Sequence, residues 1–488
     1  MQDAPLDLRS FKGKMKILHL SWIAFFLTFV VWFNHAPLMG SISQTLGLSQ
    51  TQISTLLVLN VALTNPARII IGMLTDRFGP RITYTVILAS VSVPCWIFAF
   101  ADNFSTLAWS RFALGFVGAG FVVGIRMVSE WFPAHELGTA EGIYGGWGNF
   151  GSAAAAMTLP LLALWVGGED GWRWSVAITG LLSLAFAWVW WHNVTDTPKG
   201  GTYFKARHMG GLEVSSRADF ALLLVMKIPF YVALAVLAWK LSPTGVALIS
   251  EAVYLSVLAT LLVIFLYDVW SAYKVNRAVF SGGVADHDRY DFKQVAVLNV
   301  MYFATFGSEL AVVSMLPLFF AEVFALDMVV AGLLASAYAF MNLMSRPGGG
   351  WLSDRFGRKR TLAILTAGLV VGYATMATVD ASWPIALAVL AAMACSFFVQ
   401  AGEGAVFSVV PLIKRRLTGQ IAGMTGAYGN VGAVFYLTML TTLTYNEFFM
   451  LMSMTALLGL VALSLLREPQ GHVHEVAEDG SVVMIKVG

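Results

Sequence analysis

Two arginines, Arg68 and Arg346, lie at matching places in two long apolar stretches of the chain. Each precedes by nine positions an arginine of a polar turn, Arg77 or Arg355, and nine helical residues span about 13 Å. An arginine so deep in a bilayer costs roughly 2.5–3.5 kcal/mol. Neither stretch has a carboxylate near its arginine, and two facing guanidinium groups repel each other unless an anion lies between them. Since guanidinium offers a planar fork of donors, an oxyanion site shared by both arginines is predicted, with a structural ion pair as the alternative.

A second repeated element carries two asparagines. It reads GIYGGWGNFG at 142–151 and recurs as GMTGAYGNVG at 423–432. Its glycines recur at every third position and form a bare helical stripe, which permits close packing of helices. The carboxamides can donate hydrogen bonds to a small oxyanion, or they can join neighbouring helices. The residues expected to bind the anion from these elements are Gly148, Asn149, Gly429 and Asn430.

A third repeat forms a turn after each arginine. The chain reads GMLTDRFGPR at 72–81 and GWLSDRFGRK at 350–359. Glycine lets two helices approach closely, aspartate can cap a helix start, and arginine stays at the wet surface. These turns are expected to support a gate, and their matching residues are Gly72, Asp76, Arg77, Gly350, Asp354 and Arg355.

The elements that hold these residues must be mostly apolar. Of 488 residues, 58% are hydrophobic and 12% are charged, whereas an ordinary soluble domain carries about 25% charged residues. The chain must therefore be solvated mostly by lipid, and its net charge of +2 gives no sign of nucleic-acid binding. Cys95 and Cys395 lie in apolar runs without metal-ligand spacing, so neither a metal nor a cofactor is expected.

Fourteen apolar runs are long enough to cross about 30 Å of hydrocarbon. The predicted divisions are a six-helix half at 1–192, an insert with two further runs at 193–292, a second six-helix half at 293–467 and a tail at 468–488. Of the 30 Lys and Arg residues, 23 fall on one side, two on the other and five within the runs. This asymmetry predicts that both termini and the tail are cytoplasmic. The inserted pair is expected to lie outside the working core, either spanning the bilayer or lying along its surface.

The duplicated turn in two six-helix halves resembles the major facilitator superfamily, and the paired Gly–Asn–x–Gly elements with paired arginines resemble its nitrate/nitrite porter family. The segments GIRMVSEWFP (124–133) and GSELAVVSMLP (307–317) are similar to cyanobacterial-type nitrate permeases. The resemblance implies an all-α polytopic membrane protein with the major facilitator fold, which is a transporter and not an enzyme. It further implies alternating-access transport of nitrate, and of nitrite, with Arg68 and Arg346 clamping the anion.

An anion entering a cell that is negative inside needs a coupled cation, or another anion leaving in return. Glu309 and Glu403 are expected to be deeply placed and able to carry a proton, with a hydrogen bond between helices or a salt bridge to Arg111 or Arg126 as the alternative. Similar glutamates occur in the proton-coupled branch of the family that the chain resembles. Arg111, in RFALG, resembles an arginine linked to proton coupling, with snorkelling to the surface as the alternative. Proton-coupled uptake is therefore predicted. A nitrate/nitrite exchanger, or a facilitator for another small anion, is the alternative.

The expected partners are nitrate and nitrite as substrates, co-transported protons and the lipid bilayer, with no nucleic acid. The protein is expected to be a monomer in the inner (plasma) membrane. His472 and His474 are expected to belong to a solvated tail. Several aromatic residues near the expected cavity can stack on a planar anion or fill the bundle, namely Trp32, Phe33, Tyr144, Trp147, Tyr302 and Tyr338.

Overall fold

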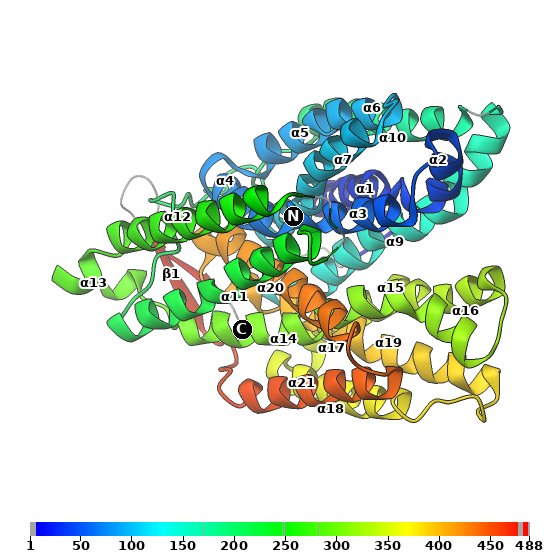
Figure 1. Ribbon diagram of the computed structural model, residues 1–488. Coiled ribbons are helices and arrows are strands. Elements are labelled where there is room, and N and C mark those ends of the chain that lie inside the picture. Colours follow the sequence, from blue (N-terminus) through cyan, green and yellow to red (C-terminus); the bar gives the residue numbers. More distant parts are fainter. Residues whose placement is uncertain are drawn as a thin grey trace.

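The chain is described from a computed structural model, which is dominated by long helices (Figure 1). The structure describes residues 6–168, 170–245, 247, 249–281, 283–476 and 482–486. Helices suit an apolar chain because each one satisfies its own backbone hydrogen bonds without water. The predicted all-α polytopic fold is confirmed, with one small β-hairpin near the C-terminus in addition.

Six helical segments precede residue 194, several of them broken into shorter pieces. They are α1 (Gly13–Phe33) with η1 (Ala36–Leu38) and α2 (Met39–Leu46), α3 (Gln50–Ala62) with α4 (Thr64–Phe78), α5 (Pro80–Ser90) with α6 (Ser92–Ala99), α7 (Phe104–Leu114) with η2 (Gly115–Ala119) and α8 (Gly120–Trp131), α9 (Ala134–Val166), and α10 (Gly171–Asn193).

The second set of helices follows the central insert. The insert contains α11 (Arg217–Leu241), α12 (Glu251–Val275), α13 (Ala278–Ser281) and η3 (Asp286–Asp288). After it come α14 (Phe292–Ala304) with α15 (Phe306–Val323), α16 (Met328–Phe340) with α17 (Asn342–Phe356), α18 (Arg358–Met376), α19 (Ile385–Phe407), η4 (Val410–Leu412), η5 (Arg415–Leu417), α20 (Thr418–Met439) and α21 (Tyr445–Leu463). The hairpin is formed by β1 (His472–Val476) and β2 (Val482–Lys486).

Ten helical segments of the described chain are long and apolar enough to cross a membrane. The other four expected spans are also helical, at α3–α4, α16–α17, α18 and α20. Two of these four carry the buried Arg68 and Arg346, and α20 carries the second glycine stripe.

The two spans that carry Arg68 and Arg346 are each broken in the middle. The breaks fall at Leu63, between α3 and α4, and at Met341, between α16 and α17, so each lies five positions before its arginine. Pro66 accounts for the first break, because proline has no N–H to donate to the carbonyl of Ala62. Each arginine therefore begins its second helical turn after a break, in the buried middle of its span.

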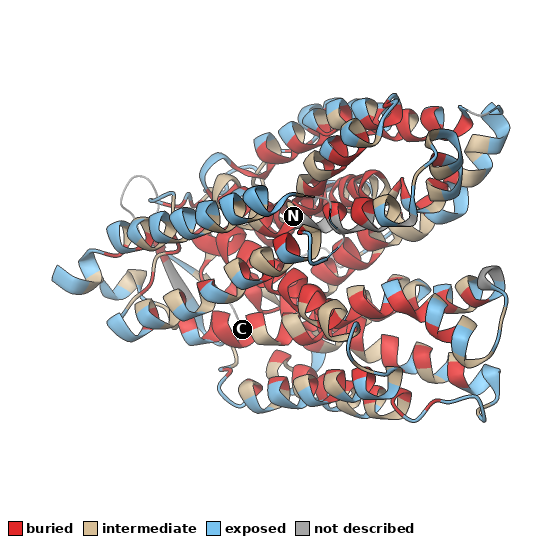
Figure 2. Ribbon diagram, in the orientation of Figure 1, coloured by how far each residue is buried: buried red, intermediate tan, exposed pale blue. Residues whose placement is uncertain are grey.

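The inserted helices form a hairpin beside the second set. α11 packs against α14, α20 and α3, whereas α12 packs against α11 and leaves its apolar stretch exposed (Figure 2). Lys227 of α11 binds both carboxylate oxygens of Asp268 of α12, at 2.7 and 2.8 Å, and Tyr231 donates to the same carboxylate. This ion pair explains how a lysine is held within an apolar helix.

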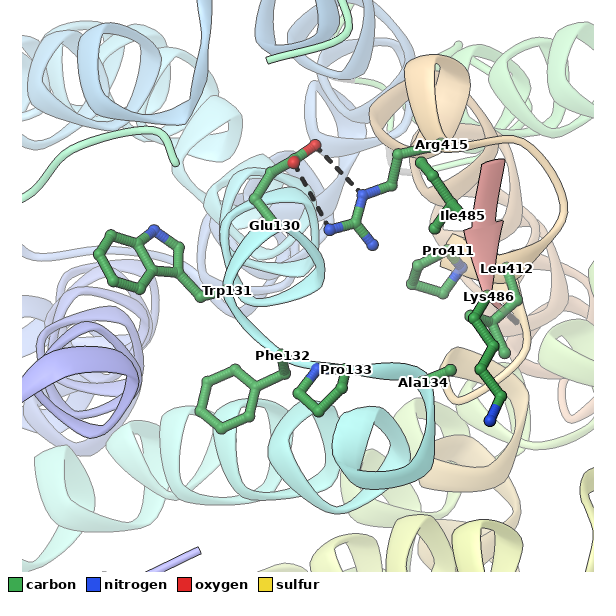
Figure 3. Close-up of a pocket in the computed structure, with 10 residues that line it drawn as sticks. All are labelled: Glu130, Trp131, Phe132, Pro133, Ala134, Pro411, Leu412, Arg415, Ile485 and Lys486. Carbon is green, nitrogen blue, oxygen red and sulfur yellow. Dashed lines mark hydrogen bonds and ion pairs between the residues drawn. The ribbon is translucent and has the colours of Figure 1, made fainter. Parts of the chain in front are cut away.

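The end of the bundle that carries the two repeated turns is called the motif end here. It comprises the ends of α4 and α17, the starts of α9 and α20, and the η4–η5 segment. The hairpin packs at this end, where Glu475 is fully buried, accepts from the backbone of Arg416 and pairs with Lys414. His472 is exposed, as a solvated tail predicts, and the side chain of His474 lies outside the described residues. Glu475, however, anchors the hairpin to the bundle. A pocket between Trp131–Ala134, Pro411–Leu412 and β2 lies at the same end, with Glu130 facing Arg415 across it (Figure 3).

Candidate functional site

Arg68 is fully buried and is held without a carboxylate partner among the described residues. Its Nη1 donates to the carbonyl of Gly426 at 2.5 Å and its Nε to the carbonyl of Gly118 at 3.4 Å. Its guanidinium also lies over the ring of Phe306, 5.1 Å from the centroid. Backbone dipoles and an aromatic face thus solvate a full positive charge.

Arg346 is buried to the same degree but has an acidic partner. Its Nη1 donates to Glu403 of α19 at 2.7 Å, and its Nη2 donates to the hydroxyl of Tyr302 at 3.0 Å. Arg346 therefore has the ion pair that the sequence leaves open as the alternative. The partner comes from a distant helix, so no inspection of the arginine's own span could reveal it.

The two guanidinium groups share one aromatic ring. Phe121 lies 5.8 Å from the guanidinium of Arg68 and 5.2 Å from that of Arg346, measured to its ring centroid. The separation of the two groups therefore cannot exceed the sum of these two distances. The expectation that the repeat brings the arginines near each other agrees with this geometry, which gives a small site with two cations and one built-in anion.

The glycine stripes cross over between the two sets of helices. An added Cβ on Gly142 would lie 2.6 Å from the backbone oxygen of Arg346, and one on Gly423 would collide with that of Arg68. One turn further, a Cβ on Gly145 would lie 2.6 Å from Nε of Arg346, and one on Gly426 would lie 3.3 Å from Cδ of Arg68. Each arginine is therefore cradled by the stripe of the opposite set.

The four residues predicted to bind the anion from these stripes lie one turn beyond the cradle. A Cβ on Gly148 would meet the ring of Phe25, and one on Gly429 would meet the ring of Phe306. Asn149 and Asn430 are both buried. Both polar side-chain atoms of Asn430 lack a hydrogen-bond partner in the part of the chain that the structure describes. The glycines thus pack against aromatic rings, while Asn430 keeps its donor and acceptor available.

Glu309 and Glu403 belong to one buried polar cluster. Oε1 of Glu309 accepts from Asn342 at 2.5 Å and from Gln400 at 3.2 Å. Glu309 lies within hydrogen-bonding reach of Glu403. The remaining oxygens, Oε2 of Glu309 and Oε1 of Glu403, have no other partner among the described residues. Two unpartnered carboxylate oxygens thus lie in the same buried cluster.

Arg111 lies apart from this cluster. It is fully buried rather than extended toward the surface. Its donors bind the side chain of Asn60 and the backbone carbonyl of Trp32, and Nη1 lies 3.2 Å from Oδ1 of Asn34. These neutral acceptors tie α1, α3 and α7 together. No described carboxylate pairs with Arg111, so the structure gives it the geometry of a helix linker.

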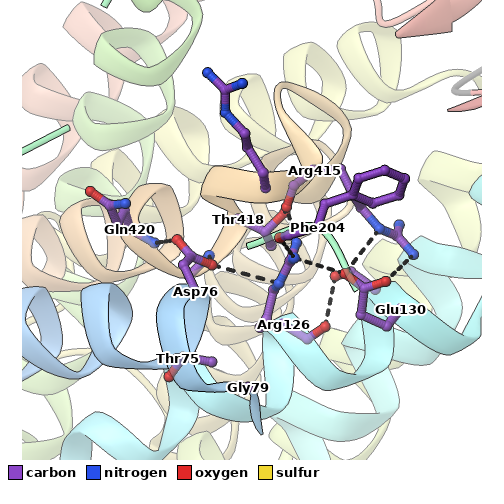
Figure 4. Close-up of polar contacts among 12 residues, drawn as sticks. Thr75, Asp76, Gly79, Arg126, Glu130, Phe204, Arg415, Thr418 and Gln420 are labelled. Carbon is purple, nitrogen blue, oxygen red and sulfur yellow. Dashed lines mark hydrogen bonds and ion pairs between the residues drawn. The ribbon is translucent and has the colours of Figure 1, made fainter. Parts of the chain in front are cut away.

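The aspartates of the repeated turns join the two sets of helices crosswise. Asp76, at the end of α4, accepts from the backbone amides of Gly419 and Gln420 of α20, at 2.7 and 2.8 Å (Figure 4). Asp354, at the end of α17, accepts from the amides of Gly138 and Thr139 of α9, at 2.9 and 2.6 Å. These two pairs of amides occupy matching positions before the two glycine stripes. We call the two aspartates and their four amides the latch.

Further contacts close the latch. Arg126 lies 3.6 Å from Asp76 and 2.9 Å from Glu130, and it also donates to the carbonyl of Arg415 (Figure 4). A Cβ on Gly72 would collide with the backbone oxygen of Gly419, and one on Gly350 would collide with that of Gly138. The motif end is therefore tightly closed in this structure.

The motif arginines themselves lie outside the latch. Arg77 donates to the carbonyl of Ala206 at 3.4 Å, in the segment that follows α10. Arg355 lies over the ring of Trp351, 5.5 Å from its centroid. The contacts between the two sets of helices thus come from the aspartates and glycines of the motif rather than from these arginines.

Several site residues could not be assigned from the sequence. Phe121 and Phe306 do not belong to any repeated sequence element. Gly145 and Gly426 belong to the glycine stripes, but the sequence does not tell which glycine of a stripe lies against an arginine. Tyr302, one of six aromatics considered, is the one that bonds to Arg346. The cross-set contacts are the information that sequence spacing alone does not contain.

The comparisons with known proteins agree with this geometry. A sequence profile of the Major Facilitator Superfamily matches residues 21–287 and 298–485. The chain is 46% identical to the nitrate/nitrite transporter NrtP of Picosynechococcus sp., over 97% of this chain and 96% of that protein. It is 45% identical to NrtP of Nostoc punctiforme, over 95% and 94% of the two chains. A probable nitrate/nitrite antiporter, NarK1 of Thermus thermophilus, is 24% identical over 94% of both chains.

Solved structures share the fold at low sequence identity. The human organic anion transporter MFSD10 superimposes with a TM-score of 0.62 at 12% identity, covering 93% of this chain and all of the other. The xylose–proton symporter XylE superimposes with a TM-score of 0.59 at 15% identity, covering 93% and 96%. With its profile match and its close relatives, the chain belongs to the nitrate/nitrite porter family of the Major Facilitator Superfamily, and it is a multi-pass membrane transporter.

Proposed function

We propose that this protein carries nitrate, and also nitrite, across the membrane together with a proton. The observation that carries the proposal is the charge of the site: Arg68 has no described acidic partner, whereas Arg346 is paired with Glu403. The site therefore holds two cations and one tethered carboxylate within a small volume. The names of the relatives, nitrate/nitrite transporters in two cyanobacteria, supply the substrate.

Nitrate fits this site because it is small, planar and singly charged. A guanidinium fork offers two parallel donors to two oxygens of such an anion. Arg68 and Arg346 can contact it from two sides, with the ring of Phe121 beneath both. The unpartnered carboxamide of Asn430 is a further donor close to the glycine cradle.

Glu403 provides the coupling to protons. Its carboxylate occupies the donor of Arg346 that nitrate would use, so the anion and the ionised carboxyl compete for one fork. Protonation of Glu403 removes the competitor, and Glu309, which accepts from Gln400 of the same helix α19, lies in the same buried cluster. One proton and one nitrate then enter together without changing the net charge of the site. This avoids the roughly 2.3 kcal/mol per 100 mV that nitrate alone would cost on entering a negative interior.

Transport follows from rocking of the two six-helix halves, 1–192 and 293–467. The latch closes the motif end, and the glycine cradles let α9 slide along α17 and α20 along α4. Breaking the amide contacts of Asp76 and Asp354 would open that end while the opposite end closes. Of the insert at 193–292, the helix α12 lies away from these moving surfaces, whereas α11 touches both halves. The segment before α11 meets the latch, because Tyr203 and Phe204 accept from Arg126.

The proposed location is the inner (plasma) membrane, with the motif end and both termini in the cytoplasm. The excess of basic residues on that side supports this orientation. The exposed apolar faces of α12 and other outer helices suit contact with lipid (Figure 2). A single chain contains both arginines and the whole carboxyl cluster, which supports a monomer as the working unit.

The test is nitrate uptake by the purified protein in liposomes, with and without an inward proton gradient, for wild type, Arg68→Lys and Arg346→Lys. Lysine keeps the charge but loses the fork. Gradient-driven uptake that is lost in both variants is expected. Uptake that requires internal nitrite and ignores the gradient would instead mean exchange, and absence of nitrate flux in every condition would overturn the assignment of the substrate.

A further inference from the structure

Glu141 of α9 is a buried carboxyl with no described partner. Its side chain is 1% exposed, and neither carboxylate oxygen accepts a hydrogen bond from any described residue. A buried polar group without a partner is costly, and a buried ionised carboxylate costs much more. A carboxyl that only joins helices would be bonded, so its lack of a partner calls for another explanation.

The position of Glu141 lies between the latch and the anion site. Residues three and four apart share a helix face, so Glu141 faces the same side as Gly138 and Gly145. The amide of Gly138 belongs to the latch, and Gly145 abuts Arg346. Along the axis, Glu141 lies about 6 Å from Gly145 toward the motif end. Opening the latch would therefore bring water to Glu141 before it reaches Arg346.

The charged groups around Glu141 are already engaged elsewhere. Arg346 of α17 and Arg415 of η5 act on it electrostatically, and Tyr144 is its titratable neighbour on α9. Each nearby ion on the packed elements has a partner of its own, namely Arg346 with Glu403 of α19, Arg415 with Glu130 of α8, and Lys14 of α1 with Glu136. With the latch closed, Glu141 is thus placed to hold a proton rather than a charge.

We propose that Glu141 is the carboxyl that passes the transported proton from Glu403 to water at the motif end. When the latch opens, Glu141 loses its own proton to water and becomes a carboxylate. It then accepts the proton from the protonated Glu403, whose carboxylate pairs again with Arg346 and displaces nitrate. One proton leaves per nitrate, and closure of the latch leaves Glu141 protonated once more.

This inference rests on the proposed proton coupling and is tested in the full-length protein in liposomes. Glu141→Gln and Glu141→Ala both remove the titratable group, the first with a side chain of similar size and the second with a much smaller one. Glu141→Asp retains a carboxyl. The matched control is Glu322→Gln, an exposed carboxyl of α15 that accepts from Tyr445. Two rates are measured for each protein, nitrate uptake driven by a proton gradient and nitrate–nitrate exchange at equal pH.

Exchange can proceed with the proton remaining on Glu403, so it does not require Glu141. The folded neutral variants are expected to lose roughly 10-fold or more of gradient-driven uptake and to keep exchange within about twofold. Glu141→Asp and Glu322→Gln are expected to retain both rates. Gradient-driven uptake that is unchanged in the neutral variants, or a parallel loss of both rates, would overturn the role of Glu141. A wild type that ignores the gradient would instead contradict the proposed function itself.

Discussion

Replacing one cradle glycine with alanine should weaken nitrate binding more beside Arg346, in Gly145→Ala, than beside Arg68, in Gly426→Ala. In Gly145→Ala, the new Cβ would lie 2.6 Å from Nε of Arg346, with Cζ and Cδ at 3.1 and 3.2 Å. The guanidinium cannot swing away freely, because Glu403 and Tyr302 hold it from the other side. In Gly426→Ala, the nearest atom of Arg68 is 3.3 Å away, and a shift of a few tenths of an ångström relieves the contact.

The magnitudes follow from these distances. Overpacking by a methyl group in a tight site costs typically about 1–3 kcal/mol, and each 1.4 kcal/mol is about a tenfold change in Kd. We therefore expect Gly145→Ala to raise the Kd for nitrate by roughly 5- to 150-fold. For Gly426→Ala we expect a change of about fivefold or less, since less than about 1 kcal/mol is at stake.

The assay is nitrate binding to purified, monodisperse protein by isothermal titration calorimetry. Gly348→Ala is the matched control, since a Cβ at this glycine of α17, two positions from Arg346, would meet no atom within 4 Å. Alanine also favours a helix over glycine by about 1 kcal/mol, so the control should bind normally and melt no lower than wild type. Equal Kd values for Gly145→Ala and Gly348→Ala would refute the cradle. A larger loss of nitrate affinity in Gly426→Ala than in Gly145→Ala would also refute it.

Three other outcomes are expected. Asp354→Asn weakens charge-assisted bonds of the latch that are worth about 1.5–3 kcal/mol each, so the motif end should open more often. A cysteine placed at the buried Gln420 should then react with a thiol reagent roughly 10-fold faster or more, and an unchanged rate would exclude the latch. Lys227→Met leaves the Asp268 carboxylate without its cation, with only the hydroxyl of Tyr231 as a donor, and should lower stability by roughly 1–3 kcal/mol. The double variant Lys227→Met/Asp268→Leu should recover the melting temperature, and both proteins should transport normally; loss of transport would show that the insert is part of the working core. At η3, burial opposes ionisation of Asp288, but hydrogen bonds from Arg416 and Arg207 hold its pKa below the ordinary value. Its contribution to stability is thus present above about pH 4 and is lost as the pH falls through the lowered pKa, so wild type should lose more melting temperature on acidification than Asp288→Asn, and equal losses would contradict the assignment.

Much of the architecture could be predicted because the chain repeats itself. The spacing of the paired arginines and of the paired asparagines identifies two halves. In the structure, the helix breaks and the amides of the latch also lie at matching positions of the two halves. The depth of Arg68 and Arg346 follows from counting positions to a polar turn, and both are buried as that count implies.

The remaining features depend on which helix faces which, and sequence spacing does not carry that information. Glu403 lies on another helix, far along the chain from Arg346, so their ion pair has no local signal. The stripes are recognisable, but the glycines that touch the arginines lie one turn before those that the sequence predicts. The anchoring of the tail hairpin is also absent from the prediction, because it depends on pairing of Glu475 with Lys414 in a distant loop.

The most direct test of the account is the number of protons that accompany nitrate into the binding site. Calorimetric titration of nitrate in two buffers of different ionisation enthalpy measures this number for wild type and for Glu403→Gln. Competition between nitrate and the Glu403 carboxylate for Arg346 predicts uptake of about one proton per nitrate by wild type and none by the variant. Nitrate binding without proton uptake by wild type, or with the same uptake by Glu403→Gln, would contradict the account.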